Sequence, residues 1–399
     1  MNILFLSSDY PPYLNGGVGT YTHQLAKHLA RRNHGAFVIT EAHETPCEYV
    51  EDGIRVWRVR PEKIAWFNEL RKQIPKLVNR FEYSKAVAQQ LKQIVKRYSI
   101  DAVESCESRA EGFWYYLFHQ RPKLFIKLHT PDGVIFDLNQ EPPSLDLNLI
   151  LKLEEWWLRK AHTLIGLTRA MTQRVGKLYQ LKTETIPKVG VPVDTDFFLP
   201  NPDLRSKASL QVLYVGRLEF RKGIHVLLRA LPRILKEIPD VQFRLIGRDC
   251  GMKPFLEKRL MDPKYRQNIR WQEFVSREEL REAYQQSHIS VVPSLWENHP
   301  AVCLEGMSSG CAVVASGVGG IPEIIQHGLT GCLVPAGSSV SLAKAVIELA
   351  RNRPQMEAMG KRARLHVEQN YATDKVLDDT LAVYERLLQK KNHHVPSYS

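Results

Sequence analysis

The sequence predicts an α/β protein built from two Rossmann-like domains. The chain of 399 residues is too long for one typical hydrophobic core, and about two domains are expected at this length. Strand patterns alternate with amphipathic helix patterns in two series, one from residue 2 and one from residue 211. Between the series, residues 189–209 are rich in Pro, Asp and Ser and follow neither period, which is typical of an interdomain linker.

The N-terminal series opens with a strand, a loop and a helix. NILFLSS (2–8) suits a buried parallel strand, and a loop with the glycines GGVG (16–19) leads into a helix pattern. AFVIT (36–40) is the next strand, and KLFIKLH (123–129) repeats the pattern further on. We therefore expect an N-terminal domain over residues 1–195.

The C-terminal series has the same organisation. QVLYVGR (211–217), VQFRLIG (241–247), ISVVPS (289–294) and CAVVAS (311–316) have strand patterns, and helix patterns lie between them. We expect a C-terminal domain over residues 196–371.

Composition is that of an ordinary globular enzyme, with 44% hydrophobic and 25% charged residues. No apolar run approaches the roughly 20 residues that span a bilayer, and the start MNILFLSS lacks the features of a secretory signal, so a cytoplasmic protein is expected. The six cysteines show no C-x-x-C spacing, which favours reduced thiols over a structural zinc site. The net charge of +12 implies attraction to anions.

Two glutamates give the strongest functional signal. Glu297 lies in a loop after the strand pattern 289–292, and Glu305 lies in the helix pattern 301–309 that precedes the strand CAVVAS. Ligands of such βαβ units bind at the carboxyl ends of the strands. Carboxylates suit hydroxyl-rich ligands and a helix N-terminus suits an anion, so a sugar attached to a phosphate would satisfy both.

Basic and polar residues follow other strands. Arg217 and Lys222 straddle a turn after the strand at 211–217, where both could hold one anionic group; the alternative is a surface basic turn. His129 ends the strand at 123–129 and could donate or accept a proton near neutral pH, although most single histidines are structural. The adjacent Asp132 is interpreted as a turn residue.

Three further segments have competing interpretations. The GGVG loop could approach a phosphate closely, but it lacks the dinucleotide fingerprint and could be purely structural. Asp194 lies in a D-x-D sequence, but we interpret it as a turn former and reject a metal site. Residues 66–98 form a basic amphipathic segment, which fits either an anionic membrane surface or a solvated helical face. Nucleic acid is not expected, because no recognition motif accompanies the basic residues.

Taken together, these motifs resemble those of the retaining glycosyltransferases of family 4. The resemblance covers nearly the whole chain and is specific in order and spacing. The matching parts are Gly16 and Gly17, His129, GVPVDTDFFLP (190–200), GRLEFRKG (216–223), QEFVS (272–276), the glutamate pair and GGIPE (319–323). One departure is GRDCG (247–251), where the family often has a second glycine two residues after the first.

The resemblance implies a GT-B fold, with two Rossmann-like domains facing a central cleft and a final helix, 372–391, that packs back on the first domain. It implies a UDP-, GDP- or ADP-sugar as donor, no cofactor and no metal. Arg217 and Lys222 would hold the diphosphate and stabilise the leaving group. Glu305 would bind the ribose, and Glu297 would contact the sugar ring.

The resemblance also implies roles for further residues. His129 would contact the donor sugar. The remaining substrate-binding residues would be Gly16, Gly17, Phe274, Val275, His299, Pro300, Ala301 and Val302.

The acceptor would be a polysaccharide, a glycolipid or a metabolite, and the protein would be cytoplasmic, with peripheral membrane association through residues 66–98 as an option. Two other hypotheses remain: a nucleotide-sugar epimerase of the same architecture, and a non-catalytic nucleotide-sugar-binding protein. An oxidoreductase is disfavoured, because the first loop lacks the dinucleotide fingerprint.

Overall fold

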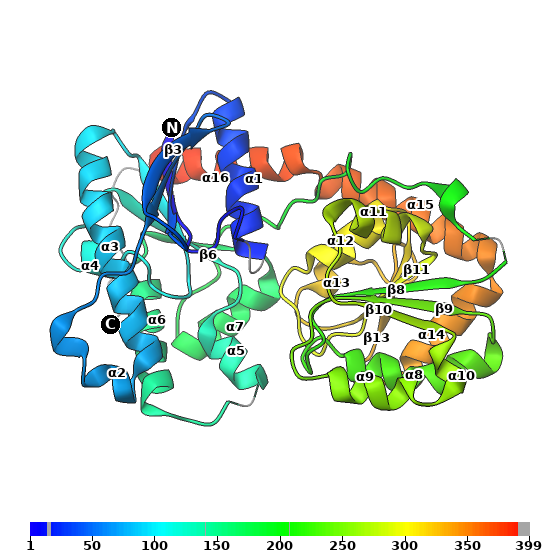
Figure 1. Ribbon diagram of the computed structural model, residues 1–399. Coiled ribbons are helices and arrows are strands. Elements are labelled where there is room, and N and C mark those ends of the chain that lie inside the picture. Colours follow the sequence, from blue (N-terminus) through cyan, green and yellow to red (C-terminus); the bar gives the residue numbers. More distant parts are fainter. Residues whose placement is uncertain (14–16, 140, 207, 390–399) are drawn as a thin grey trace. The chain divides into compact units, whose positions relative to one another are not determined.

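The computed structural model describes residues 1–13, 17–139, 141–206 and 208–389. The chain divides into two compact units (Figure 1). Unit 1 comprises Met1–Val189 together with the chain from Leu377, and unit 2 comprises Gly190–Val376. Each unit is a Rossmann-like α/β domain with its own sheet, which confirms the predicted fold class.

Unit 1 contains a seven-stranded sheet of order β3-β4-β2-β1-β5-β6-β7, which is parallel except for the edge strand β3. Helices α1 and α16 pack on one face of this sheet, and α3 packs on the other. The strands of unit 1 are β1 (Asn2–Leu6), β2 (Gly35–Glu41), β3 (Cys47–Glu51), β4 (Ile54–Val59), β5 (Ala102–Cys106), β6 (Lys123–Leu128) and β7 (Thr163–Gly166). Its helices are α1 (Gly17–Arg31), η1 (Ala65–Phe67), α2 (Leu70–Gln73), α3 (Pro75–Arg97), α4 (Phe113–Tyr116), α5 (Asp132–Asn139), α6 (Leu145–Lys160), α7 (Arg169–Tyr179) and most of α16 (Thr373–Gln389).

Unit 2 contains a six-stranded parallel sheet of order β10-β9-β8-β11-β12-β13, the doubly wound arrangement of dinucleotide-binding folds. Helices α8 and α14 cover one face, and α11, α12 and α15 cover the other. The strands of unit 2 are β8 (Gln211–Val215), β9 (Gln242–Ile246), β10 (Ile269–Gln272), β11 (Ile289–Val292), β12 (Ala312–Ser316) and β13 (Cys332–Val334). Its helices are η2 (Pro202–Leu204), α8 (Ile224–Glu237), α9 (Lys253–Leu260), α10 (Pro263–Arg266), α11 (Arg277–Gln286), α12 (Ala301–Ser308), α13 (Ile321–Ile324), α14 (Ser339–Arg351) and α15 (Arg353–Asn370).

The boundary between the units lies before the position expected from the linker composition. The structure divides the chain after Val189, whereas the sequence predicted a boundary after residue 195. Val193 and Phe198 are buried in the core of unit 2, and the Val193 amide donates to the Tyr371 carbonyl. The Pro- and Asp-rich segment is therefore packed against unit 2, although its composition is that of a linker.

The C-terminal helix returns to unit 1, where it completes a buried polar chain. The Lys127 ammonium donates to the Tyr21 hydroxyl over 2.6 Å, Tyr21 and Tyr384 are hydrogen-bonded, and Tyr384 donates to Glu104. Tyr384 lies on α16, whereas the other three side chains lie on α1, β5 and β6. Helix α16 thus supplies one link between a buried cation and a buried carboxylate. Residues 390 and 391 of the predicted helix lie outside the described residues.

The basic segment 66–98 forms η1, α2 and α3, and much of its charge is balanced locally. Arg71 pairs with the buried Glu82 and Arg80 pairs with Asp132 over 2.6 Å. Lys72, Lys76 and Lys85 also have carboxylate partners. These pairs support the interpretation as a solvated helical face, and membrane association stays a prediction.

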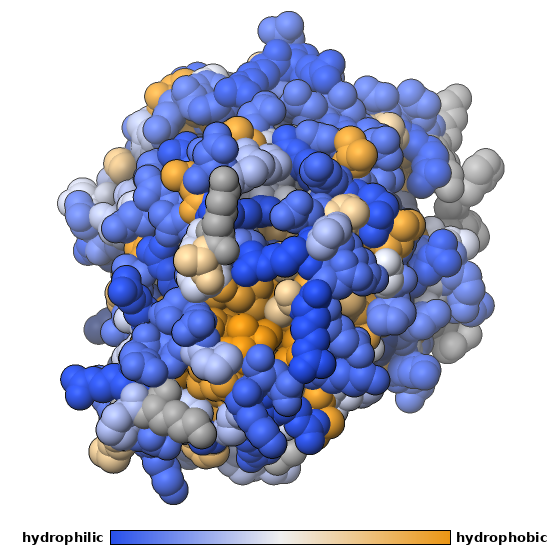
Figure 2. Space-filling view, turned by 90° about the vertical axis from the view of Figure 1, so that its right-hand side faces the viewer, coloured by the Kyte–Doolittle hydropathy of each residue, from blue (hydrophilic) through white to orange (hydrophobic). Residues whose placement is uncertain are grey.

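The face of the molecule on the side of unit 2 is mainly hydrophilic, with hydrophobic residues gathered in a central hollow (Figure 2). Within the described residues, none of the helices combines the length and the apolar character needed to cross a bilayer.

Candidate functional site

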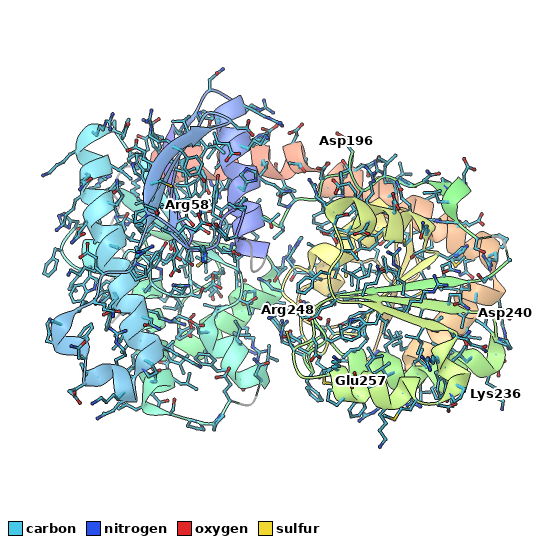
Figure 3. The ribbon with its side chains drawn as sticks, in the orientation of Figure 1. Arg58, Asp196, Lys236, Asp240, Arg248 and Glu257 are labelled. Atoms are coloured by element: carbon cyan, nitrogen blue, oxygen red, sulfur yellow. The ribbon has the colours of Figure 1, made fainter. Side chains whose placement is uncertain are left out.

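The site residues of unit 2 follow the two strands at which the strand order reverses. β8 and β11 are adjacent at the centre of the sheet, and the chain continues outward from them in opposite directions. Ligands of open α/β sheets bind at the carboxyl ends of such strands. Arg248, which follows β9, lies at this edge, whereas Lys236 and Asp240 lie at the opposite end of the sheet (Figure 3).

The loops after β8 and β11 are packed directly against each other. Gly223 has φ of 70°, and a Cβ at this position would lie 1.9 Å from the carbonyl oxygen of Pro293. Only glycine permits both this conformation and this approach. The Leu295 amide also donates to the Arg221 carbonyl over 2.7 Å. This packing brings the basic turn after β8 to the acidic loop after β11.

Lys222 and Glu297 form an ion pair at this junction. The Lys222 ammonium lies 2.6 Å from Oε1 of Glu297, the Ser294 hydroxyl donates to the same oxygen over 2.8 Å, and Arg221 lies 3.7 Å from Oε2. Glu297 is only 6% exposed. Burial opposes its ionisation, but the Lys222 and Arg221 cations outweigh burial, and the pKa of Glu297 is lowered. The structure therefore holds a carboxylate and two cations in one small volume.

Arg221 is a site residue that the sequence reasoning missed. Its guanidinium is largely buried and reaches both Glu219 and Glu297, and it donates to the Trp296 carbonyl over 3.2 Å. The predicted Arg217 is about half exposed and lies 3.3 Å from Glu219. The run RK in EFRKG was the available signal, since both cations directly precede Gly223, the residue before α8.

Glu305 lies on α12, within hydrogen-bonding distance of a second residue that was not predicted. The Tyr284 hydroxyl donates to Oε2 of Glu305 over 2.9 Å. Burial raises the pKa of Glu305, and Tyr284 and Arg277 oppose that shift. No sequence signal marked Tyr284, because an aromatic residue on an amphipathic helix is normally a core residue.

The segment His299–Val302 forms the N-terminal end of α12, with Pro300 as the residue before the helix and Ala301 as its first residue. His299 accepts a hydrogen bond from the Val191 amide over 3.4 Å, and its ring lies against Tyr371. The N-terminal end of a helix favours an anion. The N-terminal end of α12, which was predicted to bind an anion, thus follows shortly after Glu297 along the chain.

Phe274 and Val275, the residues predicted to border the base, lie in the loop after β10. Phe274 is 74% exposed, whereas Val275 is partly buried against the core of unit 2. An exposed aromatic ring after a parallel strand is available for stacking on a flat ligand.

One predicted residue of unit 1, Gly17, lies at the start of α1. Gly17 is the first residue of this helix, and a Cβ there would meet no atom within 4 Å, so close packing within the chain does not explain the glycine. Gly16 lies outside the described residues.

His129 follows β6 in unit 1 and is held by its backbone. Its amide donates to Glu107 over 2.8 Å, and its ring lies edge-on to Tyr21, with 5.4 Å between the centroids. Burial, aided by the Lys127 ammonium, lowers the pKa of His129 to about 3. We therefore infer that this ring does not exchange protons near neutral pH, because an imidazolium beside Lys127 in this partly buried position is unfavourable.

We expect the His129 ring to stay neutral throughout the range from about pH 5 to pH 8, in which an ordinary histidine changes charge. Ring NMR spectra of labelled protein would test this, with the His129→Asn variant assigning the resonance. In the urea-unfolded chain the same ring should titrate near the usual value of about 6.5. Titration of the folded protein's His129 above pH 5 would contradict the assignment.

The two aspartates that were interpreted as turn residues have structural partners. Asp194 accepts from the Phe197 amide over 3.0 Å and pairs with Arg277, which confirms the turn interpretation. Asp132 begins α5 and pairs with Arg80. Across the described parts of the chain, three or more His, Cys, Asp or Glu side chains nowhere gather as metal ligands would.

Two Rossmann-like units, the second with a cation–carboxylate cluster at its reversal point, match the architecture expected of a GT-B glycosyltransferase. Residues 15–197 match the model of Glycosyltransferase Family 4, and residues 199–366 match that of Glycosyl transferases group 1. Together the two models cover most of the chain, which identifies it as a glycosyltransferase of the family 4 type.

Two full-length relatives agree with this assignment. An uncharacterized glycosyltransferase of Methanocaldococcus jannaschii is 25% identical over 96% of this chain and 98% of its own length. A glycogen synthase of Mycobacterium tuberculosis is 22% identical over 99% and 97%.

Solved structures show the same fold. A sucrose-phosphate synthase from Thermosynechococcus elongatus has a TM-score of 0.79 at 19% identity, over 98% of this chain and all of its own. Anabaena HepE in complex with UDP has a TM-score of 0.71 at 17% identity, over 97% and 100%.

Proposed function

We propose that this glycosyltransferase moves a hexose-type sugar from a nucleotide-diphosphate sugar to a hydroxyl acceptor and retains the anomeric configuration. The observation that carries the proposal is the cluster of Lys222, Arg221 and Glu297 at the reversal point of unit 2. Breaking the bond between the sugar and the diphosphate leaves negative charge on the departing oxygen. Cations fixed in a water-poor site stabilise such charge strongly.

Glu297 keeps the two cations in place before the donor binds. Its carboxylate is already shared by Lys222, Arg221 and Ser294, so these groups need little reorganisation when a diphosphate arrives. We propose that Arg217, Arg221 and Lys222 together offset the charge of the diphosphate, so that no metal ion is required. The exposed Arg217 side chain is free to reach outward from the loop, since its partner Glu219 is also shared with Arg221.

The retaining step needs no protein nucleophile in this proposal. The acceptor hydroxyl attacks the anomeric carbon on the face from which the diphosphate departs, and the leaving oxygen takes the hydroxyl proton. The bond from carbon to the acceptor oxygen forms as the bond from carbon to phosphate oxygen breaks. His129, which is neutral, is proposed to act as a hydrogen-bonding contact for the donor sugar and not as a general acid.

The nucleotide is proposed to lie along the carboxyl edge of unit 2. Glu305 would accept hydrogen bonds from the ribose hydroxyls, and Phe274 and Val275 would border the base. Backbone N–H groups within His299–Val302, other than Pro300, would face the phosphates. HepE, a structure with the same fold, is in complex with UDP, which supports a nucleotide donor. The acceptor is proposed to be a polysaccharide, a glycolipid or a metabolite.

Melting-temperature shifts with UDP, GDP and ADP and their sugars would identify the donor, because a ligand of the native state stabilises it by mass action. Product analysis then decides the reaction. Transfer to an added acceptor with retained configuration supports the proposal. An epimerised nucleotide sugar, or binding without any turnover, would overturn it.

Replacing Glu305 with glutamine is expected to weaken binding of the stabilising nucleotide about 10- to 100-fold, because a hydrogen bond to a charged group contributes about 1.5–3 kcal/mol. Calorimetric titration would measure the change. Glu257→Gln is the matched control, since Glu257 is exposed on α9 (Figure 3). Equal affinities of the Glu305 variant and the wild type would remove Glu305 from the site.

A further inference from the structure

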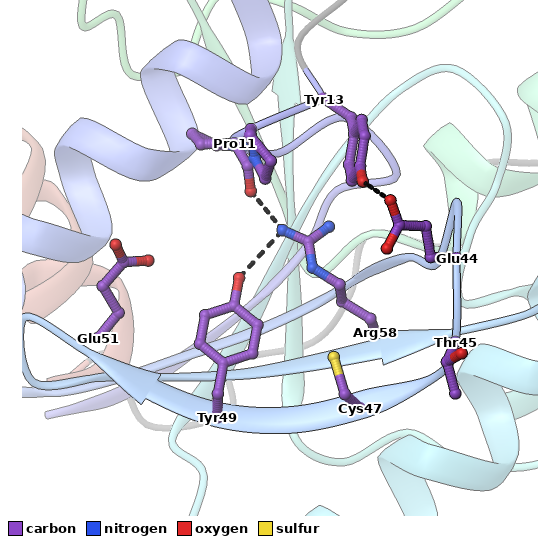
Figure 4. Close-up of a pocket in the computed structure, with 9 residues that line it drawn as sticks. Pro11, Tyr13, Glu44, Thr45, Cys47, Tyr49, Glu51 and Arg58 are labelled. Carbon is purple, nitrogen blue, oxygen red and sulfur yellow. Dashed lines mark hydrogen bonds between the residues drawn. The ribbon is translucent and has the colours of Figure 1, made fainter.

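A hollow of about 490 Å³ lies within unit 1, between the loop after β1 and the β3–β4 hairpin (Figure 4). None of the residues proposed for the donor lines it. Its lining residues are Pro11, Pro12, Tyr13, Glu44, Thr45, Cys47, Tyr49, Glu51 and Arg58.

The hollow occupies the ligand-binding edge of the sheet. Pro11 to Tyr13 follow β1, Glu44 and Thr45 follow β2, and Arg58 is close to the end of β4. β1, β2 and β4 are parallel neighbours, so their carboxyl ends share one edge. Loops at that edge carry the ligand contacts of open α/β sheets.

The hairpin register gathers the polar side chains on one side. Cys47 is paired with Arg58 and Tyr49 with Val56, so Cys47, Tyr49 and Glu51 alternate along β3 and share the face of Arg58. Figure 4 shows the Arg58 guanidinium between Tyr49 and Tyr13, with Glu51 and Glu44 on opposite sides. Every second residue of CEYVE thus contributes to one wall of the hollow.

Arg58 has an unsatisfied donor in this hollow. Its side chain is 8% exposed, and its Nη2 donates to the Pro11 carbonyl and, over 3.0 Å, to the Tyr49 hydroxyl. Its Nη1 is buried and has no hydrogen-bond partner among the described residues. No described carboxylate forms an ion pair with this guanidinium, which lies 5.7 Å from the ring centroids of Tyr13 and Tyr49. A buried charged donor without a partner is costly, so an oxygen atom of a ligand is the expected partner.

The other lining groups determine what kind of molecule carries that oxygen. Glu44 accepts from the Tyr13 hydroxyl over 2.8 Å, and Glu51 is exposed, so both carboxylates remain available to donors of a ligand. Tyr13 and Tyr49 add hydroxyl groups to the lining, and their rings contact the Arg58 guanidinium. The two carboxylates disfavour a diphosphate, and the charged groups of Glu44, Glu51 and Arg58 disfavour a lipid chain. Alternating hydroxyls, ring oxygens and C–H faces are the chemistry of a saccharide.

We propose that this hollow binds a saccharide unit of the acceptor, with a ligand oxygen on Nη1 of Arg58 and ligand hydroxyls on Glu44 and Glu51. The inference rests on the proposed transferase function and assigns the acceptor's chemical class. The ligand oxygen belongs to a hydroxyl of a neutral sugar or to the acidic group of a uronate or phosphosugar, and the test separates these sources.

Cys47 provides a local readout, because it is a free, exposed thiol on the wall of the hollow, and Cys250 is a free, exposed thiol in unit 2. Iodoacetamide labelling of both thiols would be followed by peptide mass spectrometry. The probes are glucose, galactose, mannose, N-acetylglucosamine, glucuronate and glucose 6-phosphate, with inorganic phosphate as a further arm. We expect at least one sugar to slow the labelling of Cys47 fivefold or more and to leave Cys250 unchanged.

Arg58→Met should abolish that protection, whereas Arg55→Met, on the opposite face of the same strand, should preserve it. Arg58→Lys, which keeps the charge, tests whether loss of protection reflects a disturbed loop, and melting temperatures check folding. Once an acceptor is known, Arg58→Met should raise its KM at least 10-fold without changing nucleotide binding.

Failure of this inference is distinguishable from failure of the proposed function. If no sugar protects Cys47, if Arg58→Met is protected like the wild type, or if inorganic phosphate alone protects equally and marks an adventitious ion only, the hollow is not a saccharide site. Nucleotide stabilisation of the chain is unaffected by any of these results. Conversely, absence of nucleotide binding overturns the proposed donor, while sugar protection of Cys47 still stands.

Discussion

Replacement of Lys222 by methionine is expected to lower kcat for sugar transfer by about 10²- to 10³-fold, the usual effect of removing one group that stabilises developing negative charge. Lys222 lies 2.6 Å from Glu297, and the Ser294 hydroxyl holds the same carboxylate oxygen. Methionine keeps the aliphatic stem and removes the charge. The expected loss is mainly in kcat, since the ammonium acts on a charge that develops as the diphosphate departs.

Two comparisons make this result specific. Lys236→Met removes an exposed cation at the opposite end of the same sheet and should leave kcat unchanged (Figure 3). Lys222→Met also leaves Glu297 with Arg221 as its remaining cation, so the double variant Lys222→Met/Glu297→Gln shows whether an unpaired buried carboxylate contributes to the loss. Melting temperatures of all variants exclude unfolding as the cause. Wild-type turnover in a folded Lys222→Met protein would contradict the proposed mechanism.

Replacement of Glu104 by leucine is expected to destabilise unit 1 by about 3–5 kcal/mol, because removal of one member of a buried charge pair leaves the other uncompensated. Glu104 and Lys127 are both buried, and the hydroxyls of Tyr21 and Tyr384 connect them. Burial raises the pKa of Glu104 and lowers that of Lys127 to about 8, while each charge opposes the shift of the other. The Glu104→Leu variant removes that mutual support.

The double variant Glu104→Leu/Lys127→Met should recover most of the lost stability, because apolar replacements of similar volume often match a buried pair. Urea unfolding followed by tryptophan fluorescence would measure both, since five of the seven tryptophans lie in unit 1, namely Trp57, Trp66, Trp114, Trp156 and Trp157. The exposed pair Lys344 and Glu348 is the control, and its removal should change little. Equal stability of Glu104→Leu and the wild type would show that the polar chain carries no net coupling.

The fold could be predicted from the sequence because each domain repeats elements with strong hydrophobic patterns. Strand patterns such as ISVVPS and CAVVAS correspond to β11 and β12, and REELREAYQQS corresponds to α11 with its capping box at Ser276. The apolar runs of the two strands indicate that they are buried, since buried parallel strands need continuous apolar runs. The β3–β4 hairpin was not predicted, because CEYVE is mostly exposed and has no apolar period.

The candidate site could be predicted from the sequence only in part. Glu297, Lys222 and Glu305 were predicted from motifs that follow strands, but their partners came from elsewhere in the chain. Tyr284 lies on a neighbouring helix. Arg221 directly precedes Lys222, which the sequence analysis had selected instead. A sequence indicates which groups follow a strand, but not which of them share a buried volume.

The sequence by itself determined the two-domain α/β class, the family resemblance and the residues at the strand ends, because local periodicity and motif order are written along the chain. The tertiary structure decided the electrostatics. Packing of Gly223 against Pro293 brings Lys222 to Glu297, and burial beside Lys127 keeps His129 neutral. It also decided that Arg58 has an unpaired donor in a hollow. Charge states and unpaired donors depend on desolvation and on neighbours distant in sequence, which become defined only when the chain folds.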